Sequence, residues 1–589
     1  MIVRMQKVTL LVREADRRSA LQHLGTLGVL HVQSVRNPVA EDIDRLQAER
    51  ERASRALQIV RDGRPEGAGK DPADLAPRVQ EILDLSRQRE EGQRALEELE
   101  GQKRWFDTWG AVSYESLERL TQTGLTVRFY VAERSQLGAL PTDRFIQVVR
   151  EDKKVAYLVH VAPSPEVRLD CREESMPPVE LAALQARIAA QRSRLEEIDR
   201  SLAGMAGLAG GLRTYQADLE RRLEFSQVQH GMGQEAGIAY LQGFCPVDAV
   251  PALRQAADRE GWAYLIEEPS PDDEVPTLIR TPRWLRIVQP VFQFMGTVPG
   301  YREHDISLWF LMFFSTFFAI LIGDAGYGTV FLLLTAWFAR KHRQAPREPF
   351  LLMYVLSGAT VVWGAASGTW FGYEGFARLP LLSALILDQI SSWRDESQTF
   401  VMYLCFVIGA AHLSVAHALV GLRIGLPRGL AQLGWILILW SVFFVVGTLV
   451  LGRLLPGLAM LLLGIGVAMV LFFANFQRNV LKGILKTLGD LPLSIISSFS
   501  DIVSYLRLFA VGSASVVMAS SFNGMALDIG FGSVVAAFGA AVVLALGHLI
   551  NVALGLMAVI VHGVRLNMLE FSGHLSMQWS GRPYRPFRT

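Results

Sequence analysis

The chain has 589 residues, of which 58 are Lys or Arg and 57 are Asp or Glu, and half of its residues are hydrophobic. Charged residues are unevenly spread, because residues 1–304 hold 87 of them and residues 305–589 hold only 28. This asymmetry excludes a fully soluble enzyme and predicts a soluble first half followed by a membrane domain.

Several kinds of binding site are not expected from the composition. A net charge of +1 without a basic stripe gives no reason to expect nucleic acid. The three cysteines lie far apart, which leaves no disulfide framework and no paired-cysteine metal site. The sequence has no phosphate-binding loop motif, so we expect no bound cofactor and no nucleotide hydrolysis by this chain alone.

The first half, residues 1–304, is expected to be a cytoplasmic domain, because the N-terminus has no apolar run long enough for a signal peptide. Residues 1–35 read as strand, helix and strand, and residues 236–268 add a strand, a helix and a final strand. We expect these two segments to form one small α/β lobe. Runs rich in β-formers at about 112–172 predict a second, distal lobe. The fold class expected for this half is therefore α+β.

Two helical arms, at about residues 41–110 and 178–225, are expected to join the lobes as an antiparallel coiled-coil rod. About 50 residues per arm at 1.5 Å per residue gives a length on the order of 75 Å. Gly and Pro between residues 61 and 77 interrupt the first arm. The second arm repeats apolar residues at three- and four-residue spacing: Leu181, Leu184, Ile188, Leu195, Ile198, Leu202 and Met205. The same pattern also fits simple packing or dimerisation.

The second half, residues 305–589, is expected to be an all-α membrane domain of eight transmembrane helices. A 33-residue apolar run, Leu308 to Arg340, is too long for one helix and is split into two at Gly323–Gly328. The last two spans are unusually long, which predicts strong tilt or extension beyond the bilayer. Besides the two helices of the 33-residue run, six further spans, including the two long ones, lie near residues 350–373, 399–422, 432–452, 456–476, 491–527 and 532–568.

The orientation follows from the distribution of basic residues. Loops assigned to the inner side carry nine Lys or Arg residues, and loops assigned to the outer side carry three. An even number of spans returns the basic C-terminus to the same side as the N-terminus. Both termini are therefore expected in the cytoplasm.

The seventh span holds Arg507 among apolar and small residues. An arginine at the centre of a bilayer costs at least about 2.5–3.5 kcal/mol and cannot lose its charge. It must face water, a carboxylate or both. Asp501 and Glu570 are candidate partners, but both are expected nearer the membrane ends. We therefore expect the counter-charge on another subunit.

The last span carries a stripe of polar residues on one helical face, because three- and four-residue steps connect His548, Asn551, Gly555, Ala558, His562 and Arg565. Ser504 shares a face with the arginine of the seventh span in the same way. Two polar stripes on two tilted helices predict two water-filled half-paths and no continuous pore. For any single His, a hydrogen bond to a neighbouring helix is the other reading.

These motifs resemble the a subunit, also called subunit I, of the V-type and A-type rotary ATPases. The segment Ser504–Leu508 matches that family's ring-facing arginine motif, and His562–Leu566 with Glu570-Phe571 looks like its second-arginine motif. Gly323–Gly328 and Tyr584–Phe587 match its interspan break and its C-terminal signature. Short loops are similar to those of prokaryotic members.

Two departures from the family pattern affect the expected site. The segment Tyr301–Ser307 lacks the Pro that archaeal-type members usually have after Asp305. Eukaryotic members place a carboxylate about three turns before the second arginine, where this chain has Gly555. The outer half-path would then have to use other polar groups, namely His548 and Asn551.

The resemblance implies a non-catalytic stator subunit that carries H⁺ or Na⁺ through two half-channels against a ring of proteolipids, in the cell membrane. The last two membrane helices would contact the ring, and the N-terminal domain would bind peripheral stalk subunits. Arg507 and Arg565 would carry translocation. Further half-channel candidates, on the cytoplasmic side or beside the first arginine, are Glu570, His562, His574, Ser504 and Asp501.

Two other classes remain open at this point. A secondary transporter would bind an anionic substrate at Arg507, and it would show an internal repeat among its spans. A membrane receptor would need a sizeable outer sensor domain, whereas the longest outer loop has only about 25 residues.

Overall fold

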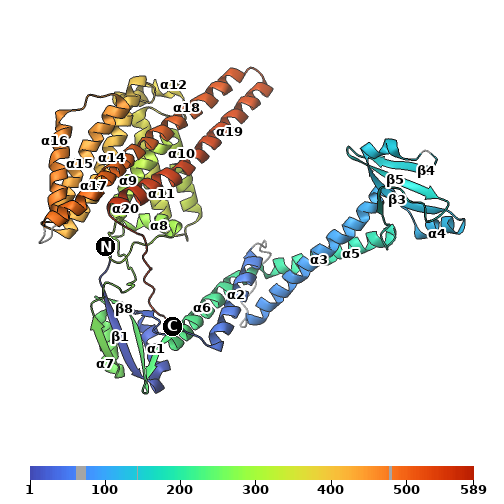
Figure 1. Cartoon of the computed structure of the whole chain (residues 1–589), viewed down its shortest axis with the longest axis horizontal. Helices are drawn as coiled ribbons and strands as arrows, with labels where there is room; N and C mark the ends of the chain where they lie inside the picture. Colours follow the sequence, from blue (N-terminus) through green and yellow to red (C-terminus); the bar gives the residue numbers. More distant parts are fainter. Residues whose placement is uncertain (62–74, 142, 476–479, 589) are drawn as a thin grey trace. The chain divides into compact units, whose positions relative to one another are not determined.

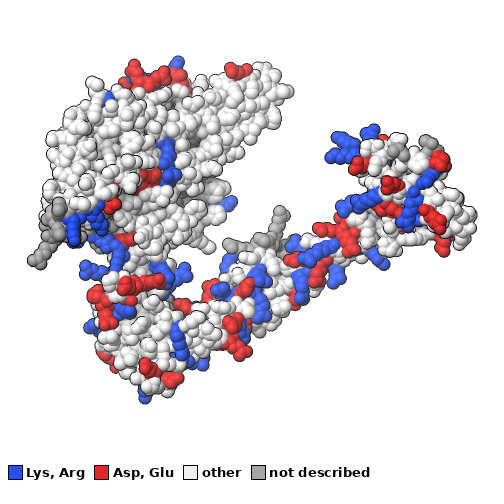
Figure 2. All heavy atoms as spheres, in the orientation of Figure 1, with Lys and Arg blue, Asp and Glu red and all other residues white. Residues whose placement is uncertain are grey.

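A computed structural model describes residues 1–61, 75–141, 143–475 and 480–588. The chain forms two compact units. The peripheral unit comprises Val8–Gly243, Ala252–Leu265 and Pro586–Thr589, and the membrane unit comprises Met1–Lys7, Phe244–Pro251 and Ile266–Arg585. Charged side chains crowd the two sheets and the helices between them, whereas the membrane helices show few charges on the face drawn (Figure 2).

The first sheet has the strand order β2-β8-β1-β9, with β7 paired to β8. Val8, Leu10 and Val12 alternate inward on β1 and are buried, as period-two patterning requires. Strands from both ends of the N-terminal half thus share one sheet. Its elements are β1 (Met5–Arg13), α1 (Arg17–Leu27), β2 (His31–Gln33), β7 (Gly233–Glu235), β8 (Ile238–Pro246), α7 (Val250–Glu260) and β9 (Ala263–Glu267).

The second sheet is antiparallel along β4-β5-β3-β6. Trp105 and Trp109 pack edge-on against Phe129, which lies on β3, with ring centroids 4.9 and 5.2 Å apart. The expectation of an α+β N-terminal half with two small sheets is confirmed. The elements of this lobe are α4 (Tyr114–Gln122), β3 (Thr126–Glu133), β4 (Phe145–Glu151), β5 (Val155–Ala162) and β6 (Arg172–Glu174).

Four helices connect the two sheets: α2 (Glu41–Arg61), α3 (Ala76–Trp109), α5 (Leu181–Gly204) and α6 (Ala209–Gly231). Figure 1 shows α3 beside α5, and Gln191 of α5 donates a hydrogen bond to the Gly92 carbonyl of α3 at 3.0 Å. Along α5 the predicted seam residues Leu184 to Leu202 are buried. Most of the predicted interruption at 61–77 lies outside the described residues.

The second half is helical and crosses the membrane several times. Within the described residues, five helical segments are long and apolar enough to span a bilayer, or six if one bent pair counts as a single span. The helices are α9 (Ser307–Ile322), α10 (Ala325–Lys341), α11 (Glu348–Ser367), α14 (Asp395–Ile424), α15 (Gly429–Leu451), α16 (Gly457–Phe473), α17 (Val480–Ser504), α18 (Leu506–Ile529) and α19 (Val534–Ala558).

The bent pair consists of α9 and α10, between which the chain bends by 120° at Gly323 and Asp324. Gly323 adopts a positive φ of 69°, a conformation that glycine allows at little cost. The buried Asp324 carboxylate then accepts hydrogen bonds from four backbone N–H groups, of Gly326, Tyr327, Phe371 and Gly372. The break predicted at this motif is thus a capped turn buried in protein.

Replacing Asp324 with alanine is expected to destabilise the membrane unit on the order of 3 kcal/mol or more, because four buried backbone donors lose their acceptor. Thermal unfolding of the detergent-solubilised complex would measure the loss. The matched control is Asp388→Ala, whose carboxylate is 71% exposed and pairs with Arg394. Equal melting of the two variants would contradict this assignment.

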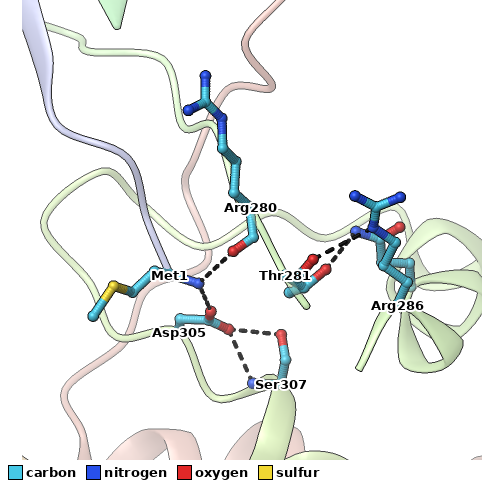
Figure 3. A network of polar contacts seen from close by, with 7 residues as sticks. Met1, Arg280, Thr281, Arg286, Asp305 and Ser307 are labelled. Carbon is cyan, nitrogen blue, oxygen red and sulfur yellow. Dashed lines mark hydrogen bonds and ion pairs between the residues drawn. The ribbon is translucent and has the colours of Figure 1, made fainter. Parts of the chain in front are cut away.

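The first membrane helix begins in a polar network that Figure 3 shows from close by. Asp305 accepts hydrogen bonds from the Ser307 backbone N–H at 3.1 Å and from its hydroxyl at 2.6 Å. The Met1 ammonium pairs with the same carboxylate and donates to the Arg280 carbonyl at 2.9 Å. Asp305 therefore fixes the turn that leads into α9 through its bonds to Ser307, the first residue of the helix.

The last two long helical segments both depart from regular α-helix. The seventh predicted span divides at Tyr505 into α17 and α18, and the stretch that is apolar enough to span a bilayer covers Lys482–Ile529. The final segment continues beyond α19 as two π-helical turns, Val559–Gly563 and Leu566–Phe571. A π turn closes i→i+5 hydrogen bonds, so residues five apart come to lie on one side.

Candidate functional site

Arg507 lies in the first turn of α18, directly after the break at Tyr505. Its Nη2 donates a hydrogen bond to the Ser504 hydroxyl at 2.7 Å. The same nitrogen lies 3.5 Å from Glu570 Oε1, and the arginine side chain is 28% exposed. The guanidinium is therefore held from behind while part of it faces outward.

Glu570 is the buried acid of the site, with a side chain only 4% exposed. Its Oε1 also lies 3.5 Å from Nε of Arg565, so one carboxylate oxygen serves two arginines. Glu570, one of the two candidate partners named from the sequence, is thus a counter-charge of Arg507 within the chain itself, and a further counter-charge on another subunit stays a prediction. Glu570 Oε2 has no hydrogen-bond partner among the described residues.

The π turn explains why regular helical spacing misplaces this acid. Arg565 immediately precedes the turn Leu566–Phe571, and Glu570 lies within that turn, five residues after Arg565. In an α-helix residues five apart point in different directions, whereas the i→i+5 turn brings them to one side. The helix thus folds its own carboxylate back between the two arginines.

A cavity of about 530 Å³ opens beside this cluster. The structure brings Asp501, Arg565, Glu570 and His574 together in its wall. His574 Nε2 lies 3.1 Å from Asp501 Oδ2. His562 does not line the cavity, although it was expected among these groups, and its Nδ1 is buried without a hydrogen-bond partner in the part of the chain described.

His548 and Asn551 form a separate polar cluster on α19. His548 Nδ1 lies 2.7 Å from the Tyr327 hydroxyl, and its Nε2 lies 3.1 Å from Asn523 Oδ1. Asn551 donates to the same tyrosine hydroxyl at 3.1 Å and exchanges hydrogen bonds with Ser515. The two expected residues are therefore close together, and helices α10 and α18 satisfy them.

No model of a protein family matches the chain. A V-type ATP synthase subunit I from Treponema pallidum, named subunit I 1, is 31% identical over 625 aligned residues that cover all of both chains. The chain belongs to the subunit I family of V-type ATP synthases. Another relative, subunit I of Borreliella burgdorferi, is 29% identical over 613 residues, covering 100% of this chain and 99% of its own.

The chain also aligns with a solved structure, the cytoplasmic N-terminal domain of a subunit I that is homologous to subunit a of V-ATPase. The alignment covers 44% of this chain and 99% of that one, at 18% identity and a TM-score of 0.22. The family assignment rests on the full-length relatives and not on this alignment. As a subunit I, the chain is a multi-pass, non-catalytic membrane stator that translocates ions within a V/A-type ATPase.

Membership of the subunit I family decides against the secondary transporter and the receptor considered from the sequence. Sequence analysis did not identify several polar residues that belong to one or the other of these two clusters. His417 and Gln432 line the cavity, and Tyr327 connects His548 to Asn551. A histidine inside an apolar run, as in α14, was the available signal for the first of these.

Proposed function

We propose that this subunit forms two offset half-channels against a ring of proteolipids, each proteolipid carrying one buried carboxylate, and that Arg507 faces that ring. The observation that carries the proposal is the environment of Arg507. The guanidinium is fixed by Ser504 and backed by a buried Glu570, yet remains 28% exposed for a further anion. A purely structural arginine would be enclosed by its own partners.

The chemistry of the ring carboxylate follows from its surroundings. Facing lipid, the carboxyl must be neutral, because burial in a medium of low polarity disfavours the anion. Facing Arg507, the anion is favoured by the fixed positive charge, so the ion is released before the carboxylate passes. The arginine also blocks a direct leak between the half-channels, since it repels any cation that approaches along either one.

Glu570 would act as a resident partner that stays behind the arginines while the ring carboxylate binds. The Oε1 atom of Glu570 lies 3.5 Å from a nitrogen of each arginine. The carboxylate therefore holds the two guanidinium groups near each other and leaves other N–H donors of each group available. Each arriving carboxylate would therefore meet two orientated cations whose mutual repulsion is partly neutralised. The attraction between the arginines and the ring carboxylate would then be strong enough to make the carboxylate release its ion and weak enough to let the ring rotate further.

The inner half-channel would be the cavity lined by Asp501, Glu570 and His574, with Arg565 at its wall. The outer half-channel would use the cluster of His548 and Asn551, which stands in for the carboxylate that eukaryotic relatives have at the position of Gly555. Each elementary charge moved across 100 mV is worth about 2.3 kcal/mol, so several ions must be coupled to each ATP.

The same proposal assigns topology and partners. The helices α9 and α10 would each cross the membrane, as would the shorter α16, which makes eight spans with both termini in the cytoplasm. The long segments that contain α18 and α19 would contact the proteolipid ring. The two lobes and the antiparallel rod of paired helices between them would bind peripheral stalk subunits and resist torque.

Replacing Arg565 with alanine is expected to slow ATP-driven ion uptake by about two- to fivefold, because its half-exposed ion pair is worth up to about 1 kcal/mol. Uptake into vesicles that contain the complete complex would measure the effect. The matched control is Arg394→Ala, which removes an exposed arginine paired with Asp388. Wild-type uptake by the Arg565 variant would refute this supporting role.

A further inference from the structure

His412 is a buried histidine on α14 that lies outside both polar clusters. Its ring stacks on those of Phe313 and Phe571, with centroids 3.9 and 4.2 Å apart and planes at 27° and 9°. Its Nδ1 lies 2.8 Å from the Tyr505 hydroxyl, whereas its Nε2 is buried without a hydrogen-bond partner among the described residues. The polar contact of this ring is thus with the residue at which the seventh predicted span is broken.

A histidine at this position costs stability. A buried nitrogen without a partner loses the hydrogen bonds that it makes to water, and a phenylalanine would join the same stack without that loss. Buried polar atoms are nearly always paired in folded proteins, so an exception needs an explanation. The hydrogen bond to Tyr505 distinguishes this ring from a phenylalanine. What His412 adds to the stack is therefore its hold on Tyr505.

Helix α14 also provides the space in which the Tyr505 ring lies, and it packs against both α17 and α18 (Figure 1). Gly409 precedes His412 by three residues, which places both on one face of α14. A Cβ atom at Gly409 would come within 2.7 Å of the Tyr505 ring, so glycine is needed for the ring to lie against this backbone. The Phe317 ring of α9 packs edge-on against the buried tyrosine, with centroids 5.9 Å apart at 72°.

The break at Tyr505 affects the direction of Arg507. Its backbone makes i→i−3 hydrogen bonds, from Tyr505 N–H to the Ile502 carbonyl at 3.2 Å and from Leu508 N–H to the Tyr505 carbonyl at 3.0 Å. Such a turn rotates the chain by about 120° per residue, whereas an α-helix rotates it by about 100°. If the break relaxed to regular helix, Arg507 would turn away from Ser504 by on the order of 20° for each residue affected. Holding the tyrosine therefore holds the arginine.

The stacking contact of His412 leads to the acid of the same site. Phe571 is the last residue of the π turn and directly follows Glu570. Glu570 Oε1 in turn lies 3.5 Å from Arg507 Nη2. One imidazole from a third helix therefore contacts the residue two positions before the arginine and the residue directly after the acid.

We propose that His412 is a positioning residue for ion translocation, which holds Arg507 and Glu570 in the geometry that the ring carboxylate meets. Through Tyr505 it holds the break that precedes the arginine, and through Phe571 it holds the turn that carries the acid. The inference rests on the ring-facing role proposed for Arg507 and adds the residue that places this side chain.

The first test combines His412→Phe with Tyr505→Phe, which removes both hydrogen-bonding groups and keeps both rings. Replacing both partners by apolar groups of similar shape costs little, and the unpaired Nε2 disappears, so the complete complex should melt no lower than wild type. ATP-driven ion uptake per complex should nevertheless fall at least about tenfold, because Arg507 is displaced. Ser414→Ala is the control on the same helix, since that hydroxyl donates to the Ala410 carbonyl. Uptake by the double variant at the control rate would overturn the inference.

The second test separates the hydrogen bond from the packing. His412→Asn places an amide near the position of Nδ1 and so keeps the bond to Tyr505, but it loses both ring stacks. We expect this variant to melt lower than the double variant and yet to pump faster. A merely structural role of His412 would give melting and pumping the same order in the two variants, and that result would overturn the inference.

Arg507→Ala, measured in the same vesicles, distinguishes this inference from the proposal on which it rests. An inactive Arg507→Ala beside a fully active double variant would overturn the role of His412 alone. An Arg507→Ala complex that pumps at the wild-type rate would overturn the ring-facing role of the arginine, and the role of His412 with it.

Discussion

Replacing Arg507 with alanine is expected to reduce ATP-driven ion uptake by at least about a hundredfold, the scale on which loss of a preorganised charge acts. The ring carboxylate would lose the fixed cation that favours its ionised form, so it would not release its ion at the stator. Uptake into vesicles, measured beside ATP hydrolysis by the same complex, would show the loss.

Assembly of this variant should remain intact, because removing a membrane arginine lowers the cost of insertion by about 2.5–3.5 kcal/mol. Glu570 would keep Arg565 as a partner. Arg507→Lys should fail as well, since a single ammonium cannot reach Ser504, Glu570 and a ring carboxylate at once. Arg378→Ala, at an exposed surface pair, is the matched control. Appreciable pumping by either Arg507 variant would reject the proposed role.

Replacing Glu570 with glutamine is expected to slow ion uptake at least about tenfold, a loss of about 1.4 kcal/mol or more. The amide keeps the shape but removes the charge that balances both arginines at 3.5 Å. The two cations would then hold each ring carboxylate too tightly and slow its departure. ATP hydrolysis coupled to rotation should fall in parallel with uptake.

The control for this experiment is Glu374→Gln, which alters an exposed carboxylate paired with Arg378. A complex that carries Glu570→Gln and pumps at the control rate would show that Glu570 only fills space. Pumping faster than the control would contradict the proposed role of Glu570 more directly, because it would mean that the Glu570 carboxylate hinders Arg507 instead of supporting it.

Much of the site was accessible from sequence because charge in a membrane is costly. Arg507 stood out in an apolar run, and Ser504 followed from helical spacing. The break at Gly323 and Asp324 was equally visible, because glycine allows a positive φ and aspartate caps a helix. These features depend on single residues and their immediate neighbours.

The remaining features depend on helix geometry and on contacts distant in sequence. No proline or glycine marks the break at Tyr505, which packs its hydroxyl 2.8 Å from His412 Nδ1 of α14. No residue type predicts the π turn that brings Glu570 close to Arg507. The contact between His417 and His574 could not be predicted from sequence, because it depends on α14 lying beside the end of the last helix. Periodicity along one helix cannot supply such information.

The most direct measurement is a structure of the assembled complex that resolves Arg507 and the proteolipid ring. We expect the guanidinium within about 4 Å of a ring carboxylate, the separation of an ion pair, with Glu570 behind it. An Arg507 that turns toward lipid headgroups, or that pairs only with Glu570 while the ring lies elsewhere, would contradict the proposed role of Arg507.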